Sequence, residues 1–172
     1  MAVTSSTTTI PVAPAASIWL RSVLVVIAGV ETALALSDFP VAFNLHNEPL
    51  SPAQFLINAR LALHPLFAIT ATALAVRGRL RAAIVALAVY VVALWFSELP
   101  SLIHYGVEWN WSPIGLSVLG QQIVFPLMAI AAVALAYYDK HLWLAAVFVA
   151  LPPLNYIVGV VIFTVAIMLY GF

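Results

Sequence analysis

Seven polar or charged residues stand within long apolar stretches of this 172-residue chain, where hydrocarbon would normally exclude them. They are Glu31, Arg60, His64, Glu98, Gln121, Gln122 and Asn155. Such groups are costly inside a bilayer unless they find partners. A set of them within membrane spans therefore indicates a site that binds a ligand or relays protons.

The charged residues among the seven predict a definite arrangement. Arg60 stays protonated and can form an ion pair with Glu31 or Glu98. The other carboxyl group, desolvated beside a like charge, could then hold a proton. It could relay that proton or donate a hydrogen bond to a ligand carbonyl. Glu98 also has a simpler interpretation, in which it only reaches water at the membrane surface.

For the amide residues and the histidine, a purely structural role is an alternative to a functional one. Gln121, Gln122 and Asn155 could merely hold helices together, because amide side chains often hydrogen-bond between membrane helices. His64 is a weak candidate for a metal ligand beside a carboxylate, or for a single axial ligand of haem. A bis-histidine haem would need a second histidine at a facing depth, whereas His104 lies at the outer boundary. A lone histidine inside a bundle is often only hydrogen-bonded to a neighbour.

The composition identifies the class of protein. With 65% hydrophobic and 7% charged residues and a mean hydropathy of +1.13, the chain has too little polar surface for a water-soluble globule. A net charge of zero argues against a nucleic-acid partner. The absence of cysteine excludes disulfides, thiolate catalysis and Cys-ligated metals. Phosphate-binding, dinucleotide-binding, zinc-protease and serine-hydrolase motifs are also missing from the sequence.

Five apolar stretches are long enough to cross a hydrocarbon core of about 30 Å. They cover residues 17–36, 51–76, 80–103, 112–138 and 141–170. Ser-Pro pairs open the second and fourth stretches, as is typical of helix starts. The sequence therefore predicts an all-α integral membrane protein, a compact bundle of five transmembrane helices that forms one domain over residues 17–172. Residues 1–16 are expected to form a flexible cytoplasmic tail.

The first apolar stretch has one alternative interpretation. Ala33-Leu34-Ala35 resembles the small-x-small cleavage site of a signal peptide. However, no basic cluster precedes the apolar run, and Arg21 lies inside it. Retention as a transmembrane helix is therefore the favoured interpretation.

Prolines interrupt four of the five stretches. His64-Pro65, Pro100, Phe125-Pro126 and Pro152-Pro153 should each remove a backbone hydrogen bond and kink a helix. The double proline is expected to break the fifth helix, as in the discontinuous helices that line transporter sites. Kinks of purely structural origin are the alternative, because they are common in membrane helices.

The helical rise converts sequence position into membrane depth. Glu31 and Asn155 lie about 21 Å from the inner ends of their spans, and Arg60 and Gln121 about 12 Å from the outer ends of theirs. In a core of about 30 Å these positions converge on one layer in the outer half. We therefore expect Glu31, Arg60 and at least one of the amide residues to face one interior space.

Basic residues and small residues predict orientation and packing. Arg77, Arg79 and Arg81 crowd the turn between the second and third stretches, and Lys140 lies between the fourth and fifth, so both turns should be cytoplasmic. The N-terminus is then inside and the C-terminus outside, and we expect the bacterial inner membrane. Helix contacts are expected at Gly29-x-x-x-Ala33 and along an alanine face formed by Ala129, Ala132 and Ala136.

The function predicted from these residues is that of a non-catalytic membrane subunit or small binding protein. Its pocket would hold a quinone or a lipid by the polar head, and haem on His64 is a weaker variant. A small proton-coupled transporter, in which Glu31 or Glu98 carries the proton, is the alternative, and a metal-dependent enzyme at His64 comes third. The expected partners are the lipid bilayer and either other membrane subunits or a second copy of the chain.

Overall fold

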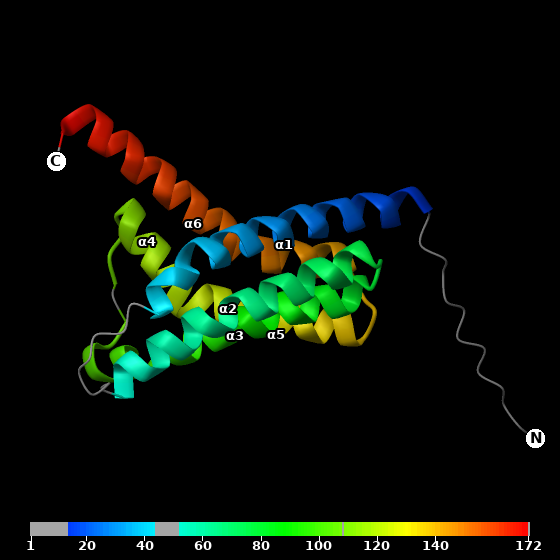
Figure 1. Cartoon of the computed structure of the whole chain (residues 1–172), viewed down its shortest axis with the longest axis horizontal. Helices are drawn as coiled ribbons and strands as arrows, with labels where there is room; N and C mark the ends of the chain where they lie inside the picture. Colours follow the sequence, from blue (N-terminus) through cyan, green and yellow to red (C-terminus); the bar gives the residue numbers. More distant parts are fainter. Residues whose placement is uncertain (1–13, 44–51, 108, 172) are drawn as a thin grey trace, which may run out of the picture.

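The computed structural model describes residues 14–43, 52–107 and 109–171, which are helical apart from short turns. The elements are α1 (Pro14–Phe43), α2 (Pro52–Val76), α3 (Leu80–Tyr105), α4 (Pro113–Leu119), the π-helix η1 (Gly120–Val124), α5 (Phe125–Tyr137) and α6 (Leu142–Tyr170). Because α4, η1 and α5 follow one another without a gap, they form one span. Five helical stretches in the described part are long and apolar enough to cross a membrane. The predicted bundle of five membrane helices is confirmed (Figure 1).

The helix boundaries agree best with the sequence where a clear end signal exists. α2 begins at Pro52 and α4 at Pro113, where the Ser112 hydroxyl accepts a hydrogen bond from the Gly115 amide at 3.1 Å. α1, by contrast, begins at Pro14 and continues to Phe43, beyond both predicted ends. No glycine follows Leu36 to end the helix there. Residues 14–16 were predicted as part of the tail but belong to α1. Residues 1–13 lie outside the described residues.

Two turns, at residues 77–79 and 138–141, lie together at one end of the bundle, which we call the turn end. An ion pair between Arg81 and Asp139 joins them. Arg21 of α1 donates a hydrogen bond to the carbonyl of Val76, the last residue of α2. These two contacts tie the helices together at the turn end.

The bundle core consists mainly of alanine. The almost fully buried alanines that pack together are Ala28, Ala71, Ala75, Ala83, Ala88, Ala129, Ala132, Ala136, Ala145 and Ala146. Small side chains let membrane helices approach closely, which strengthens their van der Waals contact. The predicted face of Ala129, Ala132 and Ala136 is confirmed. The predicted Gly29/Ala33 contact is wrong, because Ala33 is exposed and a side chain at Gly29 would meet nothing within 4 Å.

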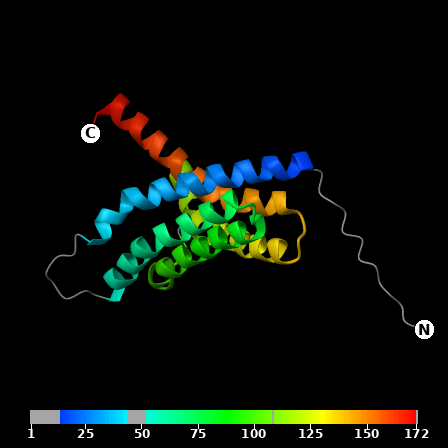
Figure 2. The ribbon, with the colours of Figure 1, turned by 45° about the vertical axis from the view of Figure 1, so that its right-hand side comes forward.

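The bundle opens at the end opposite the turn end. Figures 1 and 2 show α6 bending so that its C-terminal half leaves the bundle. The bend follows Pro152 and Pro153, whose missing amide hydrogens leave the carbonyls of Phe148 and Val149 without their usual helical donors. The predicted kink is therefore present, whereas the predicted discontinuity is not, since α6 is continuous from Leu142 to Tyr170. The diverging helices leave room for a cavity in the middle of the bundle.

Candidate functional site

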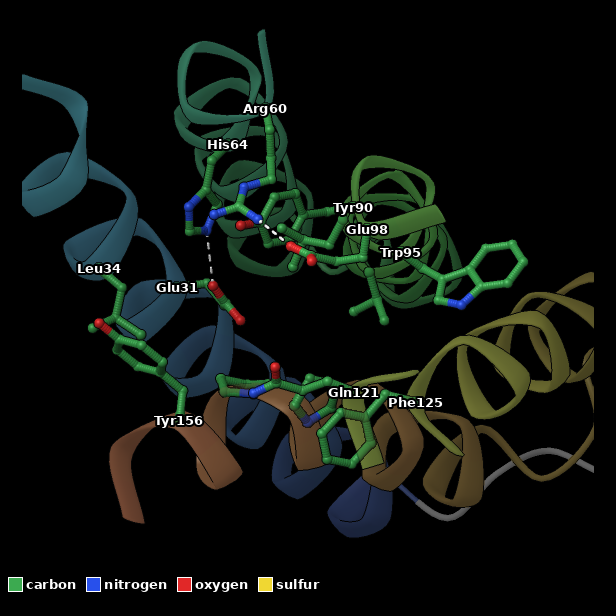
Figure 3. Close-up of a pocket in the computed structure, with 14 residues that line it drawn as sticks. Glu31, Leu34, Arg60, His64, Tyr90, Trp95, Glu98, Gln121, Phe125 and Tyr156 are labelled. Atoms are coloured by element: carbon green, nitrogen blue, oxygen red, sulfur yellow. Dashed lines mark hydrogen bonds and ion pairs between the residues drawn. The ribbon is translucent and has the colours of Figure 1, made fainter. Parts of the chain in front are cut away.

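A cavity of about 340 Å³ lies between α1, α2, α3, η1, α5 and α6, where the bundle begins to open. Five of the seven residues singled out from the sequence line it: Glu31, Arg60, His64, Glu98 and Gln121. Figure 3 shows their side chains around one space, with α1 and α2 on one side and η1 and α6 facing them. These five residues belong to four different membrane spans, which meet at this cavity.

Glu31 and His64 form the deep part of the site. His64 Nε2 lies 2.9 Å from Glu31 Oε2, and each side chain is only 8% exposed. The imidazole stacks on Tyr90, with ring centroids 4.0 Å apart and planes 8° from parallel. Because this stacking fixes the ring, His64 is held in position to hydrogen-bond Glu31. A buried carboxylate thereby gains the partner that its burial requires.

Arg60 and Glu98 form a second pair nearer the open end. Arg60 NH1 lies 3.0 Å from Glu98 Oε1, and the two side chains are 29% and 56% exposed. The sequence predicted that Arg60 pairs with Glu31 or Glu98, and the partner is Glu98. The other acid, Glu31, lines the same cavity and pairs with His64.

The two pairs lie at two levels. Counted from Val76 at the turn end, His64, the partner of Glu31, lies about 18 Å along α2, close to the middle of a 30 Å core. Arg60 and Glu98 lie about 24 and 27 Å along theirs, near the opposite boundary. The sequence estimate placed Glu31 and Arg60 in one layer, whereas Glu31 pairs with His64, one helical turn below Arg60.

Aromatic residues complete the walls of the cavity. Tyr90, Trp95, Phe125 and Tyr156 line it together with Pro152, Pro153 and aliphatic side chains. Tyr90, Trp95 and Tyr156 were not predicted as site residues, because aromatic side chains in membrane helices are usually structural. The cavity therefore combines two polar pairs with a largely apolar and aromatic surface, as is common in sites for small molecules.

Trp95 also donates a hydrogen bond to the backbone of η1. Pro126 has no amide hydrogen to donate to the Gln122 carbonyl, four residues earlier. The indole Nε1 of Trp95 donates to that carbonyl instead, at 2.8 Å. In the π-helix the Phe125 amide donates to the Gly120 carbonyl, and Gln121 lies on the cavity wall. The Phe125-Pro126 pair was the signal in the sequence that a carbonyl near residue 122 would need an outside donor.

Gln122 and Asn155 do not line the cavity. The Gln122 backbone accepts the Trp95 hydrogen bond. Asn155 donates from Nδ2 to the Ser117 hydroxyl at 2.8 Å and so joins α6 to α4. For Asn155 the contact therefore matches the alternative interpretation, a hydrogen bond that holds helices together.

Few side chains near His64 could serve as ligands of a metal ion. Within the described residues no group of three or more His, Asp or Glu side chains could hold a metal ion. His104, the other histidine weighed for haem, is exposed and packs edge-on against its neighbour Tyr105, with ring centroids 4.5 Å apart. These described residues do not fit a metal centre or a bis-histidine haem.

The exposure of the Arg60–Glu98 pair predicts a small energetic coupling. Partly exposed ion pairs are worth about 1 kcal/mol or less. Arg60→Met combined with Glu98→Gln should therefore show a coupling of at most about 1 kcal/mol in a double-mutant cycle on unfolding in detergent. The matched cycle with Glu31→Gln should be additive. A larger coupling of Arg60 to Glu31 than to Glu98 would contradict the observed pairing.

Comparison of the chain with protein-family models, with curated proteins and with solved structures finds no match.

Proposed function

We propose that the protein is a non-catalytic membrane protein, acting alone or as an accessory subunit, that binds an amphipathic small molecule such as a quinone or a lipid. The observation that supports this most is the buried Glu31–His64 pair at the wall of a 340 Å³ cavity in the middle of the bundle. Polar groups at this depth are costly in a membrane protein and commonly mark its functional site.

The lining of the cavity supports a ligand with a polar head and an apolar body. Hydrogen-bonding groups come from the Glu31–His64 and Arg60–Glu98 pairs and from Gln121. Leu34 and Leu94 add aliphatic surface to the aromatic residues of the cavity. A wholly polar solute would leave this apolar surface unmatched, whereas an amphipathic one would match both parts.

Filling the cavity should remove the bound molecule. Leu34→Trp places a larger side chain in the cavity wall, whereas Leu36→Trp, on the same helix, changes a residue that is 52% exposed. We expect Leu34→Trp to lower the amount of co-purified amphiphile several-fold, and Leu36→Trp to leave it unchanged. Solvent extraction and mass spectrometry of the purified proteins measure this amount, and circular dichroism checks that both variants are folded. Equal amounts in both variants would argue against the cavity as the binding site.

A proton-coupled transporter is the second candidate, favoured by the same buried pair. A carboxyl and an imidazole in contact near the middle of the membrane can pass a proton between them. In liposomes that enclose a pH-sensitive dye, transport would appear as proton flux that Glu31→Gln abolishes and Asp139→Asn retains. A binding protein would give no such flux in either variant.

The orientation that we propose places the turn end in the cytoplasm of a bacterial cell, with the N-terminus inside and the C-terminus outside. The positive charges of Arg77, Arg79, Arg81 and Lys140 support it. Because the chain has no cysteine, single introduced cysteines report the side of the membrane. Trp109→Cys should react with an impermeant thiol reagent on intact cells and Lys140→Cys only after lysis. The reverse pattern would overturn the orientation.

A further inference from the structure

We infer that the head group bound in the cavity carries no negative charge and donates a hydrogen bond to Glu31, as the ring hydroxyl of a quinol would. This inference rests on the proposed function, because it names the class of molecule that the same cavity holds. It concerns binding alone and involves no redox step.

The charges that line the cavity argue against an anionic head group. Among the described residues that line the cavity, Arg60 is the one with a guanidinium, and it is already paired with Glu98 at 3.0 Å. Glu31 and Glu98 supply two carboxyl groups. A phosphate or carboxylate head at Arg60 would therefore lie beside Glu98, and in the deeper part it would lie beside Glu31. Both placements put like charges close together, and the repulsion is strongest at the buried Glu31, where the dielectric constant is low.

The geometry at Glu31 favours a donor on the ligand. Among the described residues, His64 is the hydrogen-bond partner of the Glu31 carboxyl group, through Oε2. An ionised carboxyl group has room for about four hydrogen bonds. Figure 3 shows the carboxyl group of Glu31 directed into the cavity between His64 and the wall that holds Gln121. A ligand hydroxyl can donate there, whereas the carbonyl oxygen of an oxidised quinone would face another acceptor.

The remaining walls favour a flat ring over a flexible head. Trp95 and Phe125 line the cavity, and Tyr90 is held in place by stacking on His64. Aromatic side chains pack well against a flat ring, in stacked or edge-on arrangements. Gln121 can then hydrogen-bond the far side of the ring through its amide. A hydroxyl-bearing aromatic ring with an apolar chain meets these conditions together.

The test compares two forms of one probe, decyl-substituted benzoquinol and benzoquinone, which differ in their hydroxyl hydrogens. Titration into nanodiscs under anaerobic conditions, read by tryptophan fluorescence, gives the two affinities, and Trp95→Phe identifies the signal from the cavity. A hydrogen bond to the Glu31 carboxyl group predicts that the quinol binds about tenfold more tightly than the quinone. This comparison uses the unmodified protein and so does not depend on whether a variant folds.

A matched pair of variants assigns the preference to Glu31. Glu31→Gln should reduce the preference for quinol severalfold, because the amide offers one acceptor oxygen in place of the two oxygens of the carboxyl group. Asp139→Asn, the same change at the turn end and outside the cavity, should leave it intact. The use of palmitate and decyltriphenylphosphonium as further probes tests an anionic and a cationic head group.

The outcomes separate this inference from the proposed function. Equal binding of quinol and quinone, or tighter binding of palmitate or the phosphonium, with sensitivity to Leu34→Trp, would overturn the inference and leave the cavity a binding site. If none of the four probes binds and no amphiphile co-purifies, the proposed function itself is contradicted.

Discussion

Replacing His64 by leucine should lower the free energy of unfolding by about 3 to 5 kcal/mol. The substitution leaves the Glu31 carboxyl group, 8% exposed, without its partner at 2.9 Å and near the middle of the bundle. Uptake of a proton by Glu31 can relieve part of this penalty. Unfolding in mixed detergent micelles, followed by circular dichroism, measures the loss.

A double-mutant cycle separates the pair from the packing of the imidazole. His64→Leu also removes the stacking on Tyr90, so part of its effect is independent of Glu31. Glu31→Gln combined with His64→Leu should recover a large share of the loss, because no carboxyl group is then left buried without a partner. Additive effects of the two changes would show that the pair does not stabilise the fold.

Enlarging the alanine core should produce the second large effect. Ala132→Leu inserts a bulky side chain at a fully buried position of α5, and overpacking of this kind costs about 1 to 3 kcal/mol. Ala134→Leu, on the exposed face of the same helix, serves as the matched control and should cost little. The same unfolding measurement compares the two variants. Equal destabilisation would mean that close approach of the helices is not what the alanines provide.

The His64 and Ala132 predictions concern different halves of the bundle. Alanines hold the helices close together toward the turn end, where the Arg81–Asp139 pair joins the two turns. Beyond Pro152 and Pro153 the helices diverge, and the cavity occupies the space between them. Close packing in one half thus provides a rigid base for the open half, where the polar pairs lie.

The class, the number of spans and several helix starts could be predicted from the sequence because they depend on local properties. Long apolar runs predict membrane helices by length alone. Ser112-Pro113 predicts a helix start because the cap hydrogen bond forms within one turn. Five of the cavity residues could also be identified from the sequence, because a polar side chain is costly in hydrocarbon whichever way its helix is rotated. They are Glu31, Arg60, His64, Glu98 and Gln121.

Which of these residues touch each other was decided only by the tertiary structure. The partners Glu31–His64 and Arg60–Glu98 depend on the rotation of each helix and on its height relative to its neighbours. Helices that are apolar on every side carry no hydrophobic stripe from which that rotation could be read. Without such a stripe, the sequence could not show which way Gly29 faces, and the helix contact predicted there is wrong, because open space lies beside this residue.

The sequence also could not identify Trp95 as the donor to the Gln122 carbonyl, because that contact joins α3 to η1. Local chemistry thus determined which residues needed partners, and the packing of five nearly uniform apolar helices decided which partners they found.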